Sequence, residues 1–531
     1  MTATMTPYRP PQQAGRDSFT HQLHAEWTKF RTLRGWVLAM VIGAALIAVV
    51  GVLLPRGDSQ CGTGSGAACL AQVPTGPGGE AVNDSYYLAA QPLAGDGSIT
   101  VQVASLTGMI SASDGGFHTR NSPPPGSLSP GLVPWAKAGI IITAGTRPGS
   151  AYAAMMVTGS HGVLLQYDYT GDVAGLPAAA SARWLRLTRS GDVITGYDSA
   201  DGQGWTEVGS VRLAGLTGTV QAGMFAASPL DFTPNFPTYG ESGGSTAATL
   251  ATATFDDVDL RGGAAGGRWA GQAVGAAGAN YAGPRIGLRQ VGGRFAVTGS
   301  GDIGPVVAGM VNSSYDTGTL ADHLFGVFIG LLIMIVIAAM FITVEYRRGL
   351  IRTTLAASPR RGRLLAAKAV VIGLVTFLLG SAAVAVAVVA GSRIAHDSGI
   401  YVLAAGWPIE VRVILGTGAM LAVASVLALS IATMLRRSVA AVAAVVVTIV
   451  LPYILGVSGV LPASAAEWVL RVTPAAGFAI EQSVPQYWQV IGHYGPPDYY
   501  PLAPWAGLAV LGGYAAAALG LAAWLLRRRD A

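Results

Sequence analysis

Side chains that carry acid–base, metal or nucleotide chemistry occur in this sequence without the spacing that such chemistry needs. The seven histidines are scattered, and none has neighbours that complete a metal-ligand set or a catalytic triad. Glu207 and Glu241 are the only glutamates in the middle of the segment 55–320, and they form no paired motif for sugar hydrolysis. No GxxxxGK[ST] loop is present to hold nucleotide phosphates. We therefore predict no catalytic residue, no metal site and no cofactor bound by this chain, which we expect not to be an enzyme.

One short stretch, VEYRRGLIRTTLAASPRRGRLLAAK from Val344 to Lys368, contains seven basic residues and a single acidic one, Glu345. The chain as a whole is 51% apolar and only 11% charged, whereas a soluble globular chain carries about 25% charged residues. A basic stretch in such a chain is typical of a loop beside a membrane, because short cytosolic loops collect Lys and Arg. The net charge of +5 is small for 531 residues and favours this reading over nucleic-acid binding.

The elements that flank this stretch are apolar runs. Six uncharged runs are long enough to cross a bilayer, which takes about 20 residues. The runs are 37–54, 324–344, 369–390, 413–435, 439–457 and 502–526. The first could be a cleaved signal peptide, but at 18 residues it is longer than a typical signal core and lacks a small-residue cleavage site. We therefore interpret it as the first span.

Basic clusters orient these spans. Lys29, Arg31 and Arg34 precede the first span, the stretch 345–368 follows the second, Arg436 and Arg437 follow the fourth, and Arg527–Arg529 follow the sixth. Alternation across the membrane puts all four clusters on one face, which the positive-inside rule assigns to the cytosol. The prevalence of Arg over Lys, with abundant Ala, Gly and Val, indicates a high-GC bacterial source. We predict a multi-pass protein of the bacterial plasma membrane, with cytoplasmic termini and residues 55–320 extracellular.

The remaining segments follow from local pattern. Residues 1–17 are rich in Pro and Gln and are predicted to be disordered, whereas 18–36 carries an apolar stripe at helical spacing and predicts an amphipathic helix on the cytosolic surface. Residues 55–320 contain many short strand candidates, such as the alternating Ser98–Val103, and favour a two-sheet sandwich. The segment 458–501 is an extracellular loop, and 527–531 is a cytosolic tail. The predicted fold is an α-helical polytopic membrane protein of six transmembrane helices, with an all-β sandwich inserted between the first two.

Two cysteines, Cys61 and Cys69, flank a Gly-rich loop just beyond the first span. On an oxidising face such a pair is expected to form a disulfide. All six predicted spans lack Asp, Glu, Lys, Arg and His, which disfavours a proton-driven carrier. A chain that moves cargo without an internal ion relay and without its own nucleotide loop needs a partner as its energy source.

The stretch 345–368 resembles the cytosolic coupling segment of ABC-2-type transporter permeases. The segments His24–Trp36 (HAEWTKFRTLRGW) and Leu470–Gln482 (LRVTPAAGFAIEQ) resemble the N-terminal helix and the outer re-entrant helices of the same family. The resemblance covers 18–54 and 324–530, and the large insertion 55–320 departs from the family pattern. It implies the permease subunit of an exporter, with ATP used by a separate ABC ATP-binding subunit, and a second permease chain as a homo- or heterodimer partner in the lipid bilayer. The residues that it assigns to ATPase coupling are Glu345, Arg348, Gly349, Arg352, Thr353, Leu355, Pro359, Arg363 and Lys368. From charge alone, a topology signal is the favoured interpretation of the basic residues in this stretch.

The insertion resembles concanavalin A-like, laminin-G-type sandwiches, through the segments Pro134–Gly145, Ser150–Tyr167 and Ala182–Ser210. The resemblance implies an extracellular glycan or protein as ligand. Four aromatic residues are candidates for a ligand-stacking surface, with a place in the core as the alternative: Trp135, Trp184, Tyr197 and Trp205. A rival to the permease hypothesis is a membrane-anchored receptor or adhesion protein, in which the sandwich binds the ligand and the spans only anchor it.

Overall fold

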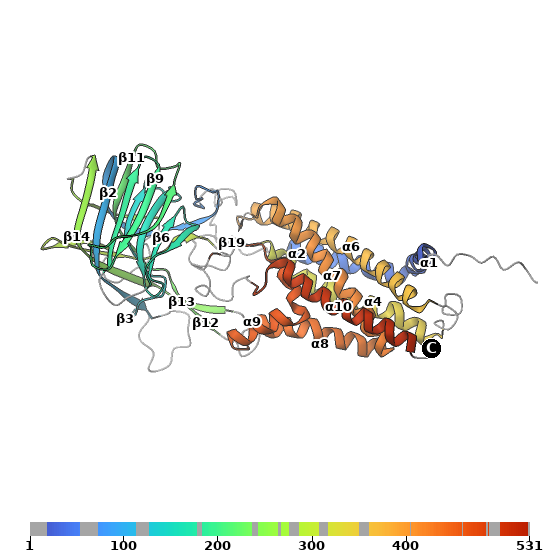
Figure 1. The fold of residues 1–531 in the computed structure, drawn as a ribbon. Coiled ribbons are helices and arrows are strands. Elements are labelled where there is room, and N and C mark those ends of the chain that lie inside the picture. Colours follow the sequence, from blue (N-terminus) through green and yellow to red (C-terminus); the bar gives the residue numbers. More distant parts are fainter. Residues whose placement is uncertain are drawn as a thin grey trace, which may run out of the picture.

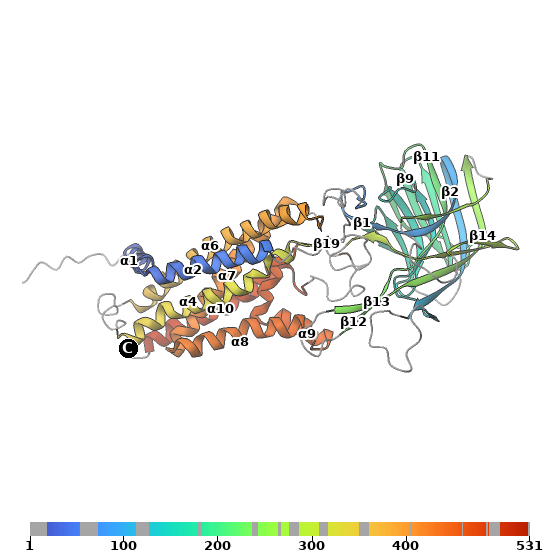
Figure 2. The same ribbon diagram turned by 180° about the vertical axis from the view of Figure 1, so that it is seen from behind.

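The computed structural model places a β domain at one end of the molecule and a bundle of long helices at the other (Figure 1). Helix α1 and the C-terminus lie at the end of the bundle farthest from the β domain, which we call the distal end; Figure 2 shows the same arrangement from behind. The structure describes residues 19–53, 73–112, 127–177, 183–235, 243–263, 267–275, 286–306, 317–349, 360–403, 405–458, 460–484, 487 and 500–528.

Six helices in this part of the chain are long and apolar enough to cross a membrane, and each overlaps one of the six apolar runs. They are α2 (Arg34–Leu53), α4 (Gly326–Arg347, preceded by the 3-10 turn η1, Ala321–Leu324), α6 (Arg361–Asp397), α7 (Trp407–Leu435), α8 (Ser438–Val457) and α10 (Pro504–Arg528). The shorter helical elements are α1 (Phe19–Thr32), α9 (Ala463–Val472) and the 3-10 helix η2 (Pro474–Glu481).

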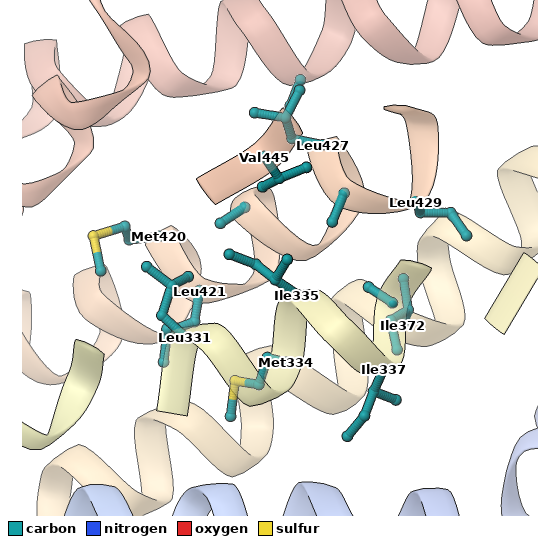
Figure 3. Close-up of a cluster of buried hydrophobic side chains, with 14 of the residues drawn as sticks. Leu331, Met334, Ile335, Ile337, Ile372, Met420, Leu421, Leu427, Leu429 and Val445 are labelled. Carbon is teal, nitrogen blue, oxygen red and sulfur yellow. The ribbon is translucent and has the colours of Figure 1, made fainter. Parts of the chain in front are cut away.

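Helices α4 and α7 form the centre of the bundle, because they have the largest buried share of these helices. Side chains from α4, α6, α7 and α8 interdigitate between them, among them Leu331, Ile335, Ile372, Leu421 and Val445 (Figure 3). The outward faces of α2, α8 and α10 carry exposed apolar side chains instead. Apolar surface of this extent on the outside of a bundle is the expected boundary with lipid.

The β domain is built on a 14-stranded sheet with the order β10-β9-β8-β2-β11-β4-β5-β6-β7, to which β3, β14, β15, β16 and β17 add. Its strands are β2 (Tyr86–Ser111), β3 (Leu128–Pro130), β4 (Lys137–Thr143), β5 (Tyr152–Thr158), β6 (Val163–Tyr167), β7 (Gly171–Ala174), β8 (Arg183–Ser190), β9 (Val193–Ser199), β10 (Thr206–Arg212), β11 (Thr219–Ala227), β14 (Thr249–Gly263), β15 (Ala270–Val274), β16 (Gly287–Val291) and β17 (Arg294–Gly299). Two-stranded pairs are β1 (Val82–Asp84) with β18 (Ile303–Pro305), β12 (Asp231–Asn235) with β13 (Gly243–Ala247), and β19 (Thr317–Gly318) with β20 (Tyr401–Val402).

Successive residues of a strand point to opposite faces, and strand β4 is buried on both. Ile140 and Ile142 belong to the core inside the curled sheet, whereas Ile141 belongs to a second core on the opposite face. That second core includes Val82 of β1 and Ile303 of β18, so this strand pair contributes to covering the sheet.

The predicted fold class is wrong. The chain is about 46% helical and 32% strand, and the β domain is one hydrogen-bonded sheet that curls into a nearly closed barrel, not two separate sheets. The physical reason is the length of β2, which has 26 residues. Its first part, Tyr86–Ala90, lies between β11 and β15, whereas Gly97–Val103 lies between β8 and β14. Gly95, with φ +71°, lies between these parts, where a side chain would be strained.

The β domain is joined to the bundle through short elements at the ends of α4 and α6. Strand β19 precedes η1 and α4, and it pairs in parallel with β20, which follows α6. Nearby, Val73, Ala81 and Val306 of the β domain form a small cluster against Tyr401 and Leu403. Helices α4 and α6 are therefore tied together at this end by backbone hydrogen bonds beneath the β domain.

Candidate functional site

Four charged side chains from three helices meet at the distal end of the bundle. Glu26 and Lys29 come from α1, Glu345 from the last turn of α4, and Lys368 from the second turn of α6. The Lys368 Nζ donates to Glu26 Oε2 at 2.6 Å and to Glu345 Oε1 at 2.8 Å. The Lys29 Nζ donates to Glu26 Oε1 at 2.7 Å and to Glu345 Oε1 at 3.3 Å. We call these four residues the distal ion cluster.

The cluster is largely removed from solvent. The side chain of Lys368 is fully buried, those of Glu26 and Glu345 are 2% and 11% exposed, and only Lys29 reaches solvent, at 41%. The ammonium of Lys368 also lies 4.4 Å from the ring centroid of Phe341, in a cation–π contact. Two carboxylates and two ammonium groups balance in charge, which is the condition under which burying ions is tolerated.

The electrostatics of Lys29 reflect this environment. Burial lowers the pKa of its ammonium, but the hydrogen bond to Glu26 and the charges of Glu26 and Glu345 outweigh burial and raise the pKa above its ordinary value. Lys29 therefore stays protonated and closes the cluster on its solvent side. The ion pairs of the cluster join three helices, and Glu345 Oε2 is the one buried side-chain oxygen of the cluster without a hydrogen-bond partner among the described residues.

The distal ion cluster joins helices on both sides of the segment 350–359. Glu345 and Lys368 stand on either side of the segment 350–359, which lies outside the described residues. Lys368 pairs with Glu26 directly, and Glu345 is linked to Glu26 through Lys29. These ion pairs therefore join helix α1 to α4 and α6, the two helices that flank the segment. Further contacts join the same end: Arg361 donates to Leu526 O of α10 at 2.7 Å, and the guanidinium of Arg436 lies 5.3 Å from the ring centroid of Tyr346.

Of the residues assigned to coupling, the structure brings Glu345 and Lys368 together. Arg348 ends α4 as an exposed cap whose N–H is bonded to Val344 O and Tyr346 O, Gly349 has φ +67°, and Arg363 is exposed in the first turn of α6. The others lie outside the described residues: Arg352, Thr353, Leu355 and Pro359. Cys61, Cys69 and Glu241 also lie outside them.

Sequence reasoning missed Glu26, the residue that joins α1 to the other two helices. Gln22, Glu26 and Phe30, at spacings of four, form the buried face of α1, whereas Phe19, Trp27 and Leu33 of the apolar stripe are exposed. A signal was available, because Glu26 is the only acid in a basic helix and shares a face with Phe30. An acid on a helix of the membrane surface would normally be solvated, and here the distant Lys368, together with Lys29 of the same helix, accounts for the burial of Glu26.

The four aromatic candidates of the β domain do not form one surface. Trp135 takes the alternative place in the core: it is 3% exposed and stacks on the ring of His161 at a centroid distance of 3.9 Å. Trp184 and Tyr197 are half-buried on neighbouring strands, and the register places Tyr197 opposite Arg186. The guanidinium of Arg186 covers the ring of Trp205 at 3.9 Å. Trp184, Tyr197 and Trp205 thus remain as one partly exposed group, and Glu207 is exposed beside them.

Comparison with known proteins leaves the family of this chain open. No family model matches it, and no curated protein matches it. Solved structures that are similar include a functionally unknown protein from Saccharomyces cerevisiae (15% identity, 33% of this chain and 72% of that chain, TM-score 0.19). Also similar are SCP-B, of the Eqolisin family of peptidases (10% identity, TM-score 0.22), and scytalido-glutamic peptidase (10% identity, TM-score 0.23), each covering 42% of this chain and 100% of the other. Likeness at this level carries no functional argument.

Proposed function

We propose that this chain is the permease subunit of an ABC transporter that exports its cargo, driven by ATP hydrolysis in a separate ATP-binding subunit. The observation that carries the proposal is the distal ion cluster, which makes a rigid unit of α1 and the two helices flanking the segment 350–359. A partner that presses on this segment would displace three helices together. An anchor has no need of such a fastening.

Membrane placement is supported by where aromatic and basic side chains lie. Exposed Trp407, Trp468 and Trp505 lie at the β-domain end of the bundle, and Trp27 and Trp524 at the distal end, as in the two aromatic belts of membrane proteins. Basic residues gather at the distal end, on the last turns of α4 and α10 and between α7 and α8. The positive-inside rule makes the distal end cytosolic and the β domain extracellular.

Helices α4 and α6 would carry the movement across the membrane. At the cytosolic end they flank the coupling segment and share the ion cluster, and at the other end they lead into the β19–β20 pair. A displacement of α4 and α6 at the cytosolic end would therefore also move the β19–β20 pair beneath the β domain. The helices would switch between inward-open and outward-open arrangements, and the β domain would move with the outer gate.

Two permease chains are expected, because six spanning helices are half of the usual transporter. The apolar outward faces of α2, α8 and α10 are available to the second chain and to lipid. For the β domain we propose an extracellular glycan or protein as ligand, at the group formed by Trp184, Tyr197 and Trp205. The competing hypothesis, a receptor or adhesion protein, uses the same surface but requires no ATPase.

Co-purification tests the proposal and separates it from its rival. The chain is co-expressed with the product of a neighbouring gene that has a GxxxxGK[ST] loop, and the complex is isolated through a tag on the permease. We expect the wild type to retain the ATPase and the double variant Arg352→Glu, Leu355→Asp to lose it. The control, Arg212→Glu with Val291→Asp, makes the same kinds of change at residues of the β domain that are 72% and 76% exposed, and should retain the ATPase.

Two outcomes would contradict the proposal. Binding of the ATPase to the coupling variant as tightly as to the wild type would show that the segment 350–359 is not the contact. Failure of any such ATPase to accompany the wild-type chain would favour the receptor hypothesis.

A further inference from the structure

A second buried ionisable group lies in the half of the bundle nearer the β domain, in the 3-10 helix η2. All eight residues of η2 are buried. The helix fits closely between α7 and α10: a Cβ added to Gly416 of α7 would lie 2.3 Å from Ile480 Cγ1, and one added to Gly507 of α10 would lie 2.1 Å from Ala476 O. Both distances are shorter than any van der Waals contact, so η2 can pack here only because Gly416 and Gly507 have no side chain. We call this position of η2 between α7 and α10 its seat.

The last residue of η2 is Glu481, whose side chain is buried. Glu481 is 5% exposed, and its Oε1 is buried without a hydrogen-bond partner among the residues that the structure describes. Its neighbour Ile480 packs on Gly416, nine residues into α7, which is about 14 Å along the helix axis from Trp407. Glu481 therefore lies between the residue that packs on Gly416 and the residue that Arg412 contacts, inside the half of the bundle nearer the β domain.

Charged and titratable groups on the elements packed against η2 leave Glu481 uncompensated. Among the described residues these groups are Glu410 and Arg412 on α7, Tyr453 on α8, Glu467 and Arg471 on α9, and Tyr514, Arg527 and Arg528 on α10. Arg527 and Arg528 are in the last turn of α10, at the distal end of the bundle. Arg412 donates from Nη2 to the backbone oxygen of Gln482, and no ion pair joins it to Glu481 in this part of the chain. Glu467 and Arg471 pair with each other, Tyr453 bonds Tyr500, and Tyr514 donates to Val472 O.

An ionised carboxylate in this position would be unfavourable for two reasons. Burial without a partner cation disfavours the charged form, and it raises the pKa of Glu481 to about 8. The C-terminal end of a helix also presents partial negative charge, which opposes a further negative group there. A neutral carboxylic acid, by contrast, can remain in the seat at modest cost.

We propose that Glu481 is a proton-binding site of the helix bundle, which holds a proton while η2 is seated between α7 and α10 and releases it to water when η2 leaves that seat. On release the carboxylate becomes a partner for Arg412, which already contacts the adjacent residue. Proton uptake would then favour the seated state, and high pH would favour the released state. This inference goes beyond the proposed function, because it needs neither an ATPase nor a cargo.

The sign of the pH effect follows from the proton balance. Between the ordinary pKa of 4.5 and the folded value of about 8, the folded state holds one proton that the unfolded state has lost. The stability contributed by this proton is complete below pH 4.5 and is lost as pH rises to about 8. Glu481→Gln mimics the neutral acid at every pH and should abolish this dependence.

The test uses the full chain in nanodiscs. We expect the melting temperature of Glu481→Gln minus that of the wild type to grow by several degrees from pH 5 to pH 9, whereas Glu467→Gln, at an exposed carboxylate of α9, tracks the wild type. A constant difference for Glu481→Gln across this range would overturn the proposal.

A second measurement uses only the wild-type chain, so it tests whether Glu481 holds a proton even if Glu481→Gln fails to fold. Dicyclohexylcarbodiimide modifies protonated carboxyl groups in apolar surroundings, and mass spectrometry locates the adduct. We expect modification of wild-type Glu481 at pH 6 and at least a fivefold decrease at pH 9.5. Equal modification at the two pH values, or none at either, would show that no proton is held there.

Discussion

Replacing Lys368 by Met removes the cation at the centre of the distal ion cluster while keeping the length of the side chain. Glu26 and Glu345, with side chains 2% and 11% exposed, would then lie close together with only the half-exposed Lys29 between them. Breaking a buried ion pair by removing one partner costs about 3–5 kcal/mol, because the remaining charge stays buried. This free-energy estimate includes the loss of the cation–π contact between Lys368 and Phe341.

Two matched variants show how much of the lost stability comes from leaving buried acids without a cation and how much comes from losing an ion pair as such. In Lys368→Met with Glu345→Gln, one buried acid is removed with its cation, and Glu26 keeps its 2.7 Å partner Lys29. We expect the double variant to recover at least half of the loss. Arg471→Met breaks a pair whose side chains are 40% and 57% exposed, and it should cost about 0.5 kcal/mol or less.

The assay is unfolding of the purified chain in mixed micelles by increasing SDS, followed by the far-ultraviolet helix signal. In a thermal melt the same loss corresponds to roughly 6–20 °C, at about 2–4 °C per kcal/mol. A Lys368→Met protein as stable as Arg471→Met would refute the reasoning that the cluster fastens α1 to α4 and α6. A double variant less stable than Lys368→Met would show that Glu345 is not held in place by this lysine.

Two further predictions concern the β domain and the seat of η2. Burial raises the pKa of Asp84 in β1 from 3.8 to about 6, despite the hydrogen bonds that it accepts, so the wild type should lose stability relative to Asp84→Asn between these pH values. The loss is on the order of 3 kcal/mol, measured in urea melts at pH 4 and pH 7, and equal melts at both would contradict it. Gly507→Ala should cost about 1–3 kcal/mol in SDS unfolding, because its Cβ would lie 2.1 Å from Ala476 O. Gly513→Ala on the same helix meets nothing within 4 Å and should gain up to about 1 kcal/mol, so equal effects of the two changes would disprove the close seat.

The positions of the long helices could be predicted because a long apolar run has few alternatives to a helix. Each of the six runs lies within or overlaps a helix of the structure. Their ends were less predictable. Helix α6 begins at Arg361, eight residues before the apolar run that predicted it, so Lys368 is a buried helical residue instead of the end of a loop. A charge beside an apolar run is usually solvated, and its burial depends on Glu26, which lies 342 residues away in sequence.

In the β domain, the alternation of polar and apolar residues predicted only part of the strand structure. Ser98–Val103 alternates because one face of that part of β2 is partly exposed, but Leu88–Gln91 is buried on both faces and shows no alternation. A strand of 26 residues that serves two parts of a sheet therefore appears in the sequence as one short strand. Whether the short strands formed two sheets or one depended on this continuity, which local pattern does not report.

The absence of ionisable residues from the apolar runs was the premise for expecting an external energy source, and the structure refines that premise. In the distal ion cluster each charge faces an opposite charge, so we expect the cluster to hold helices together and not to relay ions. Glu481 differs, because its buried carboxyl group has no cation within ion-pair distance among the described residues. A single proton moving with one 3-10 helix could bias the outer gate of the proposed transporter, but by itself it would provide no path across the bundle. If the chain is the transporter that we propose, we expect the driving force for uphill transport to enter at the distal end, through the segment 350–359 that α4 and α6 flank.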